Sequence, residues 1–359
     1  MKRRELLRSA LPWAATATVT AMWPASAWAQ APSNTAHGST VAATFGRLPS
    51  PASVQSVFAA GAPAGVLVAA LAPGKLLGWP MPLSAPARAL LGPTSAALPF
   101  LGRLAGRGST VSVETLLQLR PDLILDAGTA DATYVSAAQR VSQQTGLPTV
   151  LVKGRLAEHA AQLREVGHLL GVPQRAALLA ADADLTLALA AKVRASVPMA
   201  QRPRVYYGRS PDGLETGLDG SINLEVLDFA GGRNVAAAAG KGSLTRVSLE
   251  QILAWDPEVI VTQEPEFFRR VRSDPLWRSI SAVRNGRVHC APVLPFGWLD
   301  GPPGINRLIG VHWLLAHLHP THPAVRAQTA LPQAVQHFYH LFYGAELSLA
   351  AATRLLQGE

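Results

Sequence analysis

Two fifteen-residue stretches of this chain, 136 residues apart, have nearly the same sequence. Residues 111–125 read VSVETLLQLRPDLIL and residues 247–261 read VSLEQILAWDPEVIV, so six of the fifteen positions are identical. Most of the other positions exchange one apolar residue for another. The period is too long for a solenoid, whose units are about 20 to 50 residues long. The duplication instead predicts two similar lobes within one chain.

Each copy carries the signals of a helix followed by a strand. A Ser that can cap a helix stands two positions before a Glu. A Pro-acid pair, Pro121-Asp122 in the first copy and Pro257-Glu258 in the second, then ends the helix. The apolar run behind each pair is typical of a buried parallel strand. Because strands and helices alternate along the rest of the chain, we expect an α/β fold with two similar lobes, each a mainly parallel sheet flanked by helices.

A long helical stretch separates the two copies. Residues 174–196 are rich in Ala and Leu and contain neither Gly nor Pro, and such a helix would be about 34 Å long. We interpret it as one long connector between the lobes, the alternative being an ordinary packed helix of a single domain. The expected boundaries are an export signal at 1–29, a loose tail at 30–48, an N-terminal lobe at 49–172, the connector helix at 173–197 and a C-terminal lobe at 198–359.

Composition narrows the class of protein further. With 359 residues and 48% hydrophobic content, the chain can bury a large core. Chains of this length usually fold into more than one domain. The net charge is +9, but no basic run marks a nucleic-acid partner. Cys290 is the only cysteine, so one chain can form neither a disulfide nor a thiolate metal cluster. We interpret Cys290 as a small buried side chain.

The first 29 residues have the features of an export signal. A basic start precedes an apolar stretch from about Ser9 to Met22, and a small-x-small cleavage site ends at Ala29. Lys2–Arg8 also resembles the twin-arginine signal, with ordinary secretion as the alternative route. The signal contains no cysteine that could carry a lipid. We therefore expect a soluble, unlipidated protein of the bacterial periplasm.

With these features in place, the chain resembles the helical-backbone class (class III) of periplasmic substrate-binding proteins. The paired motifs carry the resemblance, together with Asp274-Pro-Leu-Trp277 and Asn285-Gly-Arg-Val288 of the second lobe. It covers about residues 50–345. Members of this class deliver ferric siderophores, haem, cobalamin and related metal complexes to ABC importers. The resemblance implies a monomer with a metal-chelate ligand and an ABC permease dimer as partners, no cofactor of its own, and no catalytic residues.

The resemblance also implies a role for one glutamate of each repeat. Glu114 and Glu250 match the family residues that dock against arginines of the permease. Two carboxylates at equivalent points of two lobes can contact a two-fold symmetric transporter together, and charge pairing sets the orientation. The alternative is that each Glu only supports the start of its helix.

The candidate ligand site lies in the loops that follow the expected strands, because parallel sheets bind ligands beyond the carboxyl ends of their strands. A helix start offers amide groups to an anion, and arginines bind carboxylates and stack on rings. We expect three arginines to hold negative groups and aromatic side chains to pack against the ligand. Core packing and solvated loop arginines are the alternatives. The candidates are Gly61, Pro63, Trp79, Arg103, Arg107, Tyr206, Tyr207, Arg209, Phe296 and Trp298.

The sequence does not identify the ligand or its metal. Tyr206 or Tyr207 could bind a ferric ion as a phenolate. The cleft loops lack a His/His/carboxylate set for bare zinc or manganese, and histidines gather instead at 312–322. On family frequency we expect a ferric siderophore, with haem, cobalamin and a molybdate-type oxyanion as alternatives.

Alternatives of another class are a secreted hydrolase and a ligand sensor. The chain after the signal has no Gly-x-Ser-x-Gly element and no phosphate-binding loop pattern. These absences favour a binding protein over an enzyme. They do not separate transport from sensing.

Overall fold

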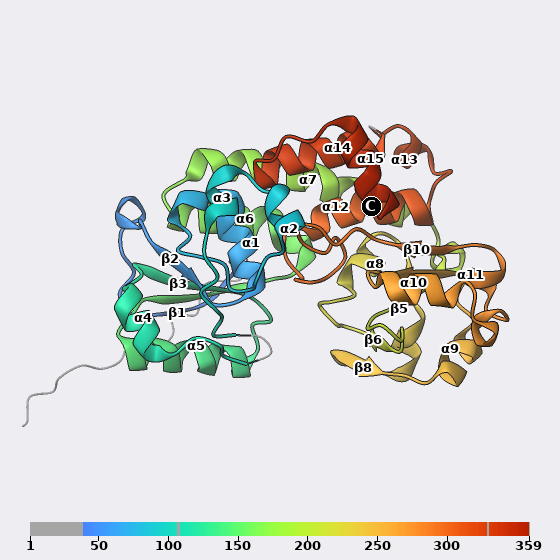
Figure 1. Cartoon of the computed structure of the whole chain (residues 1–359), viewed down its shortest axis with the longest axis horizontal. Helices are drawn as coiled ribbons and strands as arrows, with labels where there is room; N and C mark the ends of the chain where they lie inside the picture. The colour runs from blue at the N-terminus through green and yellow to red at the C-terminus, as the bar shows by residue number, and fades with distance from the viewer. Residues whose placement is uncertain (1–38, 106–107, 329, 359) are drawn as a thin grey trace, which may run out of the picture. The chain divides into compact units, whose positions relative to one another are not determined.

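Each half of the chain folds around its own four-stranded sheet (Figure 1). The computed structural model describes residues 39–105, 108–328 and 330–358, and all of them fall within one compact unit. The expected export signal and the candidate Arg107 lie outside the described residues. Two lobes with parallel sheets flanked by helices confirm the fold class that the sequence predicts.

The N-terminal sheet has the strand order β1-β4-β3-β2. Strands β2, β3 and β4 are parallel, and β1 runs antiparallel to β4 at the edge. Helices cover both faces, so consecutive residues of β3 are buried: Leu123 and Leu125 join the cluster that contains α1, whereas Ile124 packs with Leu116 of α4. The elements are β1 (Val41–Phe45), β2 (Val57–Ala59), α1 (Ala62–Leu71), α2 (Ala85–Ala89), α3 (Pro93–Ala97), α4 (Val113–Leu119), β3 (Leu123–Gly128), α5 (Ala132–Thr145), β4 (Thr149–Lys153) and α6 (His159–Leu169).

Strand β1 differs from the expectation of a loose tail over 30–48. The described part of that tail contains β1, which pairs with β4 from Val41↔Val152 to Phe45↔Thr149. Ala43 and Phe45 are buried against Leu151 and Ala138. A five-residue strand between polar segments carries a weak local signal, and its pairing with a distant strand defines it.

The C-terminal sheet has the order β10-β9-β5-β7, and its strands are all parallel. A separate two-stranded antiparallel ribbon, β6–β8, projects from this lobe. The elements are β5 (Arg204–Gly208), β6 (Glu215–Gly217), α8 (Glu225–Phe229), β7 (Arg233–Asn234), β8 (Leu244–Arg246), α9 (Leu249–Trp255), β9 (Val259–Thr262), α10 (Pro265–Val271), α11 (Ser281–Arg284) and β10 (Val288–Cys290).

The connector helix α7 (Pro173–Ser196) has 24 residues, close to the expected 174–196. It does not stand alone, because α12 (Arg307–Leu318) packs along it. One cluster of buried apolar side chains includes Val150 of the first sheet, Ala183 of α7, Leu314 of α12 and Val259 of the second sheet. The chain ends with α13 (Pro323–Arg326), α14 (Leu331–Phe338), a π-helical turn (Tyr339–Tyr343) and α15 (Leu349–Gln357).

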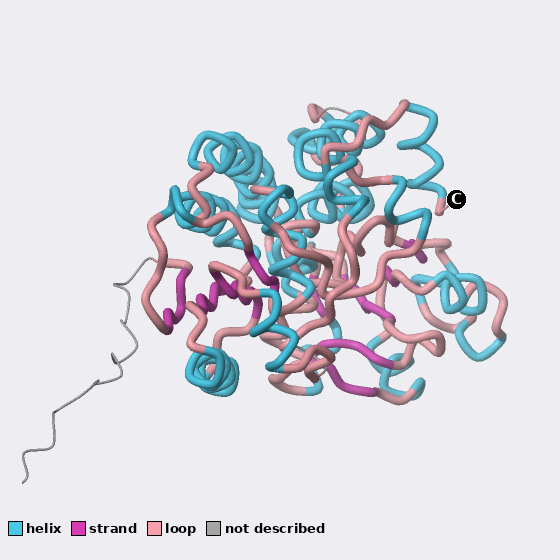
Figure 2. The backbone as a smooth tube through the Cα atoms, turned by 60° about the vertical axis from the view of Figure 1, so that its left-hand side comes forward, coloured by secondary structure: helices cyan, strands magenta, loops and turns pink. Residues whose placement is uncertain are grey.

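Helix α12 packs against both α7 and α14, and these three helices lie together above the two sheets in Figure 1. Figure 2 shows helices gathered in the same upper part of the molecule. This arrangement leaves the carboxyl ends of the strands to form the opposing loops described below. Within the described residues, no helix has the length and apolar character needed to span a bilayer.

Candidate functional site: the pocket between the lobes

A pocket of about 580 Å³ lies between loops of the two lobes. One wall follows β3 and β4, where a parallel sheet places its ligand site. The other wall comes from the loops beside the β6–β8 ribbon. The volume is within the usual range for small-molecule sites. The lining residues are 128–130, Lys153, Arg155, 219–222 and 241–243.

The N-terminal wall is built on a close approach of two glycines. The Gly154 N–H donates to the Gly128 carbonyl at 2.7 Å, and a Cβ on Gly154 would lie 2.6 Å from the Gly128 Cα. Gly128 also has a φ of 143°, which favours glycine. This contact sets the loops after β3 and β4 side by side. It also places Lys153 and Arg155 at the wall, with the Lys153 Nζ 2.9 Å from the Ser39 carbonyl.

The C-terminal wall is held mainly by backbone hydrogen bonds. The Asp219 N–H donates to the Gly240 carbonyl, and the Gly242 N–H donates to the Asp219 carbonyl, both at 3.1 Å. Ser221 is 5% exposed, and its Oγ has no hydrogen-bond partner within the described residues. A buried hydroxyl without a partner carries a desolvation cost that a ligand can remove. Ser221 is therefore a candidate ligand contact.

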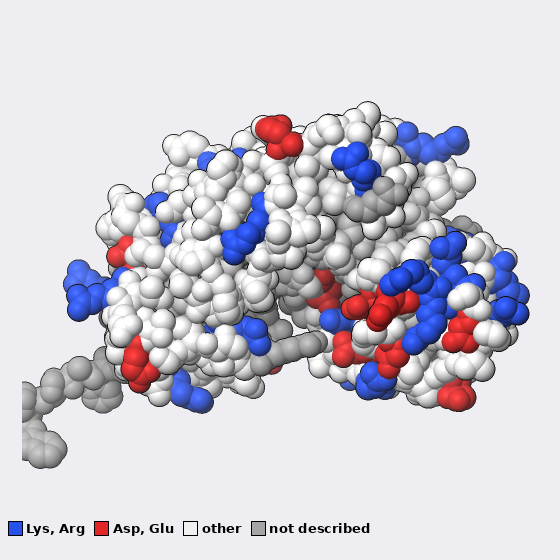
Figure 3. All heavy atoms as spheres, in the orientation of Figure 1, with Lys and Arg blue, Asp and Glu red and all other residues white. Residues whose placement is uncertain are grey.

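The pocket is electropositive. Among the described residues, three cationic side chains, Lys153, Arg155 and Lys241, line it together with one carboxylate, that of Asp219. Glu225, behind the lining residues, pairs with Arg155. Figure 3 shows that charged side chains of both signs are dense on the C-terminal half in that view. A pocket of this charge suits an anionic ligand.

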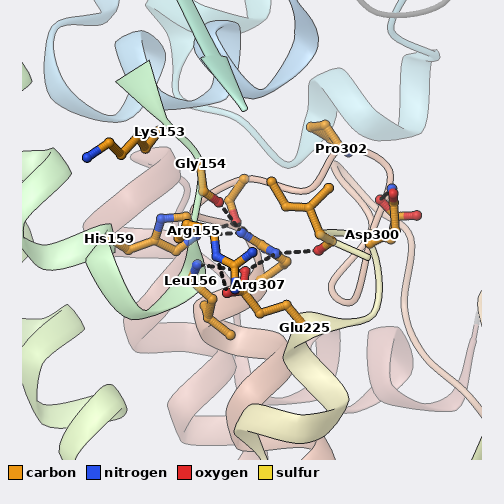
Figure 4. Close-up of polar contacts among 12 residues, drawn as sticks. Lys153, Gly154, Arg155, Leu156, His159, Glu225, Asp300, Pro302 and Arg307 are labelled. Atoms are coloured by element: carbon orange, nitrogen blue, oxygen red, sulfur yellow. Dashed lines mark hydrogen bonds and ion pairs between the residues drawn. The ribbon is translucent and has the colours of Figure 1, made fainter. Parts of the chain in front are cut away.

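An ion network next to the pocket joins the two lobes (Figure 4). Glu225 of α8 pairs with Arg155, with 2.9 Å between Nε and Oε1. The second carboxylate oxygen of Glu225 accepts the Leu156 N–H at 2.9 Å and lies 3.4 Å from Arg307 Nη1. The Arg155 side chain is 54% exposed, so its guanidinium can also reach solvent or a ligand.

Asp126 is a buried carboxyl near the end of β3. It is 7% exposed, and burial raises its pKa to about 6, although the Ala127 N–H donates to it. A Cβ added to Gly61 would lie 3.3 Å from its Oδ1. Asp126 is therefore protonated in part near neutral pH, beside the helix start that the sequence predicts as an anion contact.

The five aromatic candidates lie in the core instead of on the pocket wall. Trp79, Tyr206, Tyr207, Phe296 and Trp298 are each at most 3% exposed. Trp79 Nε1 donates to the Ser95 carbonyl, and its ring lies 5.4 Å from that of Phe296. Strand β5 is covered on both faces, so both of its tyrosines are buried.

The two tyrosine hydroxyls are occupied by protein acceptors. Tyr206 donates to the Gly213 carbonyl at 2.7 Å and Tyr207 to Gln263 Oε1 at 2.8 Å. Burial raises the pKa of both phenols, which opposes a phenolate ligand. The described residues also contain no group of three His, Cys, Asp or Glu side chains suited to a metal ion.

The other described ligand candidates do not line this pocket. Gly61 and Pro63 form the start of α1 as expected. Arg103 lies in a loop, where its Nε donates to the Gly108 carbonyl at 3.1 Å. Arg209 is 16% exposed and pairs with Asp300 at 3.0 Å. Neither Arg103 nor Arg209 is among the residues that line this pocket, and the charge of Arg209 is matched within its own lobe. Arg107, the third arginine of the expected clamp, lies outside the described residues.

The histidines of 312–322 bind local groups. His312 Nε2 lies 3.0 Å from Thr186 Oγ1, and His322 Nε2 lies 2.8 Å from Ser196 Oγ. Both contacts join the C-terminal helices to α7. Cys290 is half-buried, and burial raises the pKa of its thiol to about 11, which fits a packed side chain better than a nucleophile.

Glu114 and Glu250 occupy matching, exposed positions in the first turns of α4 and α9. The pKa of Glu114 is lowered mainly by its own backbone N–H, and that of Glu250 mainly by the Ser248 hydroxyl. Both carboxylates are therefore charged at neutral pH and accessible from solvent.

Four lining residues are absent from the candidates predicted from the sequence: Lys153, Arg155, Ser221 and Lys241. Lys153 and Arg155 could have been found, because the expected strand at 149–152 places them at its carboxyl end. Ser221 and Lys241 lie in loops that no strand end marks, and only tertiary structure brings them to the pocket.

The geometry agrees with comparisons to known proteins. The model of the periplasmic binding protein family matches residues 102–292, more than half of the chain. The chain therefore belongs to this family, and its fold is that of the class III binding proteins of ABC importers.

Individual relatives and solved structures agree with this family membership. The chain is 26% identical over 265 residues to the molybdate-binding protein MolA of Haemophilus influenzae, covering 67% of this chain and 72% of that protein. It is 26% identical over 194 residues to the Fe(3+) dicitrate-binding periplasmic protein FecB of Escherichia coli, covering 51% and 60%. An ABC transporter solute binding protein from Sulfurospirillum deleyianum superposes with a TM-score of 0.75 at 29% identity, covering 85% of this chain and 94% of that one. These relatives are transport proteins that bind substrates, not enzymes.

Proposed function

We propose that this chain is the periplasmic substrate-binding component of an ABC importer and that it captures a compact, metal-containing anion in the pocket between its lobes. The observation that carries the proposal is the charge of that pocket. Three cations face one carboxylate there, and Ser221 contributes a buried hydroxyl that has no partner in the described structure. Charge-assisted contacts of this kind are the strong ones for an anion.

The pocket favours one ligand class among those the family carries. A ferric siderophore is the expectation from family frequency, with haem, cobalamin or a molybdate-type oxyanion behind it. The aromatic side chains that would pack against a bulky ring system are buried in the core, and the described residues that line the pocket include no aromatic one. We therefore place a molybdate-type oxyanion first and a ferric carboxylate siderophore second. The names of two relatives, molybdate-binding and Fe(3+) dicitrate-binding, support these two chemistries.

We also propose how the chain reaches the periplasm and delivers its ligand to the permease. The chain is exported by the twin-arginine route, remains unlipidated, and acts as a monomer in the periplasm. Glu114 and Glu250 dock the loaded protein on a dimeric permease, one glutamate to each half. Their matched exposure and charge support this role. A sensor that uses the same pocket is the second candidate, and association with a permease separates the two.

Calorimetric titration tests the ligand class. The probes are molybdate, ferric citrate, sulfate, haemin and cyanocobalamin. We expect molybdate or ferric citrate to bind and the two macrocycles not to bind. The double variant Arg155→Gln with Lys241→Gln should then lower the affinity about 100-fold, because each lost charged contact is worth about 1.5 kcal/mol.

The control is Arg140→Gln, an exposed arginine on α5 that does not line the pocket. It should bind like the wild type. Tight binding of haemin that survives the double variant would refute the anion pocket.

A further inference from the structure

Two charged residues join the lobes directly beneath the pocket, although neither of them lines it. Arg307, in the first turn of α12, is fully buried. Its Nη2 donates to the Gly154 carbonyl of the N-terminal lobe at 2.7 Å. Its Nη1 donates to the Ile222 carbonyl of the C-terminal lobe at 2.8 Å. One guanidinium therefore holds a backbone carbonyl of each lobe (Figure 4).

Glu225 makes the complementary set of contacts. It belongs to the C-terminal lobe, yet it accepts the Leu156 N–H and pairs with Arg155, both in the N-terminal lobe. It is also the carboxylate that pairs with Arg307, at 3.4 Å. A buried guanidinium requires a counter-charge, since an unpaired buried ion costs several kcal/mol. The charge of Glu225 therefore stabilises the position of Arg307 as well as that of Arg155.

His159 lies beside the same guanidinium. Its Nε2 lies 3.1 Å from the Gly304 carbonyl and 3.3 Å from Arg307 Nη2. Burial, followed by the charge of Arg307, lowers the pKa of His159 to about 3, so the ring is neutral. The neutral ring packs against the guanidinium without adding a second positive charge. The negative charges that act on Arg307 are those of Glu225, which has the larger effect, and Asp300.

We propose that Glu225 and Arg307, with the contacts named above, form an inter-lobe clasp that sets the distance between the two pocket walls. The segments that the clasp holds are 154–156 and 222–225, which continue directly from the lining residues Lys153 and Ser221. Glu225 is a positioning residue in this arrangement. Its effect on ligand affinity rests on the proposed function, whereas its effect on lobe spacing does not.

The test compares two carboxylate-to-amide variants. Glu225→Gln removes the charge of the clasp. Glu258→Gln is the matched control, because Glu258 also accepts a backbone N–H, that of Arg204 at 2.8 Å, and pairs with the same arginine at 3.8 Å. All its contacts lie within the C-terminal lobe. Glu225→Asp, which keeps the charge on a shorter side chain, serves if Glu225→Gln does not fold.

Lobe spacing is measured by electron–electron double resonance between spin labels. The labels are attached at Gln144→Cys and Ser273→Cys, two exposed positions in opposite lobes, in a Cys290→Ser background. We expect a single narrow distance distribution for the wild type and for Glu258→Gln, and a broadened or shifted one for Glu225→Gln or Glu225→Asp. An unchanged distribution in a folded Glu225 variant would overturn the clasp.

Ligand affinity is measured in parallel with molybdate and ferric citrate as probes. Glu225→Gln should weaken binding about tenfold, with Glu258→Gln unchanged. Altered lobe spacing with unaltered affinity would overturn the positioning role. If no probe binds the wild type, the proposed ligand class fails, while the spin-label distances still decide the clasp.

Discussion

The two lobes match closely where a helix leads into the central strand and differ where that strand ends. Helices α4 and α9 each begin at a Ser cap with ψ near 160° and end in a left-handed residue, Arg120 at φ 45° or Asp256 at φ 39°. The acid after each proline binds the start of the neighbouring strand. Asp122 accepts the Ser56 N–H, and Glu258 accepts the Arg204 N–H, both at 2.8 Å.

At the carboxyl ends of β3 and β9, the two lobes no longer match in sequence. Position 126 is a buried Asp, and its counterpart 136 residues later is Thr262, whose hydroxyl accepts the Glu264 N–H at 3.0 Å. Beyond β3 the chain runs through Gly128 into the pocket wall, whereas no residue directly following β9 lines the pocket. The duplicated motif therefore builds the scaffold, and the strand ends carry the differences that a ligand site requires.

The largest expected effect concerns Glu114 and Glu250, the two glutamates at equivalent positions of the duplicated motif. Replacing Glu114 and Glu250 together by Ala should abolish uptake and leave ligand affinity unchanged, because both side chains are exposed and remote from the pocket. Each single variant should reduce uptake to a similar extent if the lobes dock equivalently. Uptake is measured as cellular accumulation of the bound ligand, and affinity by calorimetry.

Glu266→Ala, an exposed carboxylate of α10, is the control for this pair and should transport normally. A drop in ligand affinity in the double variant would show that the glutamates do not act at a docking surface. Strongly unequal single variants would show that the two lobes contact the permease differently.

The next effect concerns Asp126, where the lobes differ. Burial raises its pKa to about 6 from 3.8, so the folded protein binds a proton between about pH 4 and 6 that the unfolded chain does not. This carboxylate therefore destabilises the fold above pH 6, and the penalty disappears as the pH falls through that range. Two pKa units correspond to about 3 kcal/mol.

Asp126→Asn should accordingly be about 2 to 3 kcal/mol more stable than the wild type at pH 7.5. The difference should fall to about 1 kcal/mol near pH 4.5 and nearly vanish below about pH 3.5. Urea unfolding followed by tryptophan fluorescence measures the difference. Asp131→Asn, at the exposed start of α5, should show no such gain. A constant difference between Asp126→Asn and the wild type across this pH range would mean that the carboxyl has an ordinary pKa.

The sequence predicted the parts of the fold that local signals define. The repeated Ser caps and Pro-acid pairs located α4, β3, α9 and β9, and an Ala- and Leu-rich run located α7 within one residue. The site was harder to predict, because it depends on which side chains the packing leaves exposed. Tyr206 and Tyr207 are the clearest case: both were expected as ligand contacts at the end of a strand, but β5 is covered on both faces and both side chains are buried. Lys241 reaches the pocket only through the pairing of the loops beside β6 and β8.

The smallest expected effect tests whether the matching motifs also contribute equally to stability. Ser112 accepts the Thr115 N–H at 3.1 Å, and Ser248 accepts the Gln251 N–H at 3.3 Å. Replacing either Ser by Ala should lower the free energy of unfolding by about 1 kcal/mol. Because the two caps lie in different lobes, the double variant should lose the sum of the two single losses to within about 0.5 kcal/mol.

One difference sharpens this test. Only α9 has a complete capping box, in which Gln251 Oε1 also accepts the Ser248 N–H at 2.9 Å. That second bond survives Ser248→Ala, so α9 should lose slightly less stability than α4 does in Ser112→Ala. Urea unfolding of the two single variants and the double variant measures all three values. If the double variant loses markedly more stability than the sum of the two single losses, the two helix starts are energetically coupled. The core cluster that both lobes share through α7 would then carry that coupling.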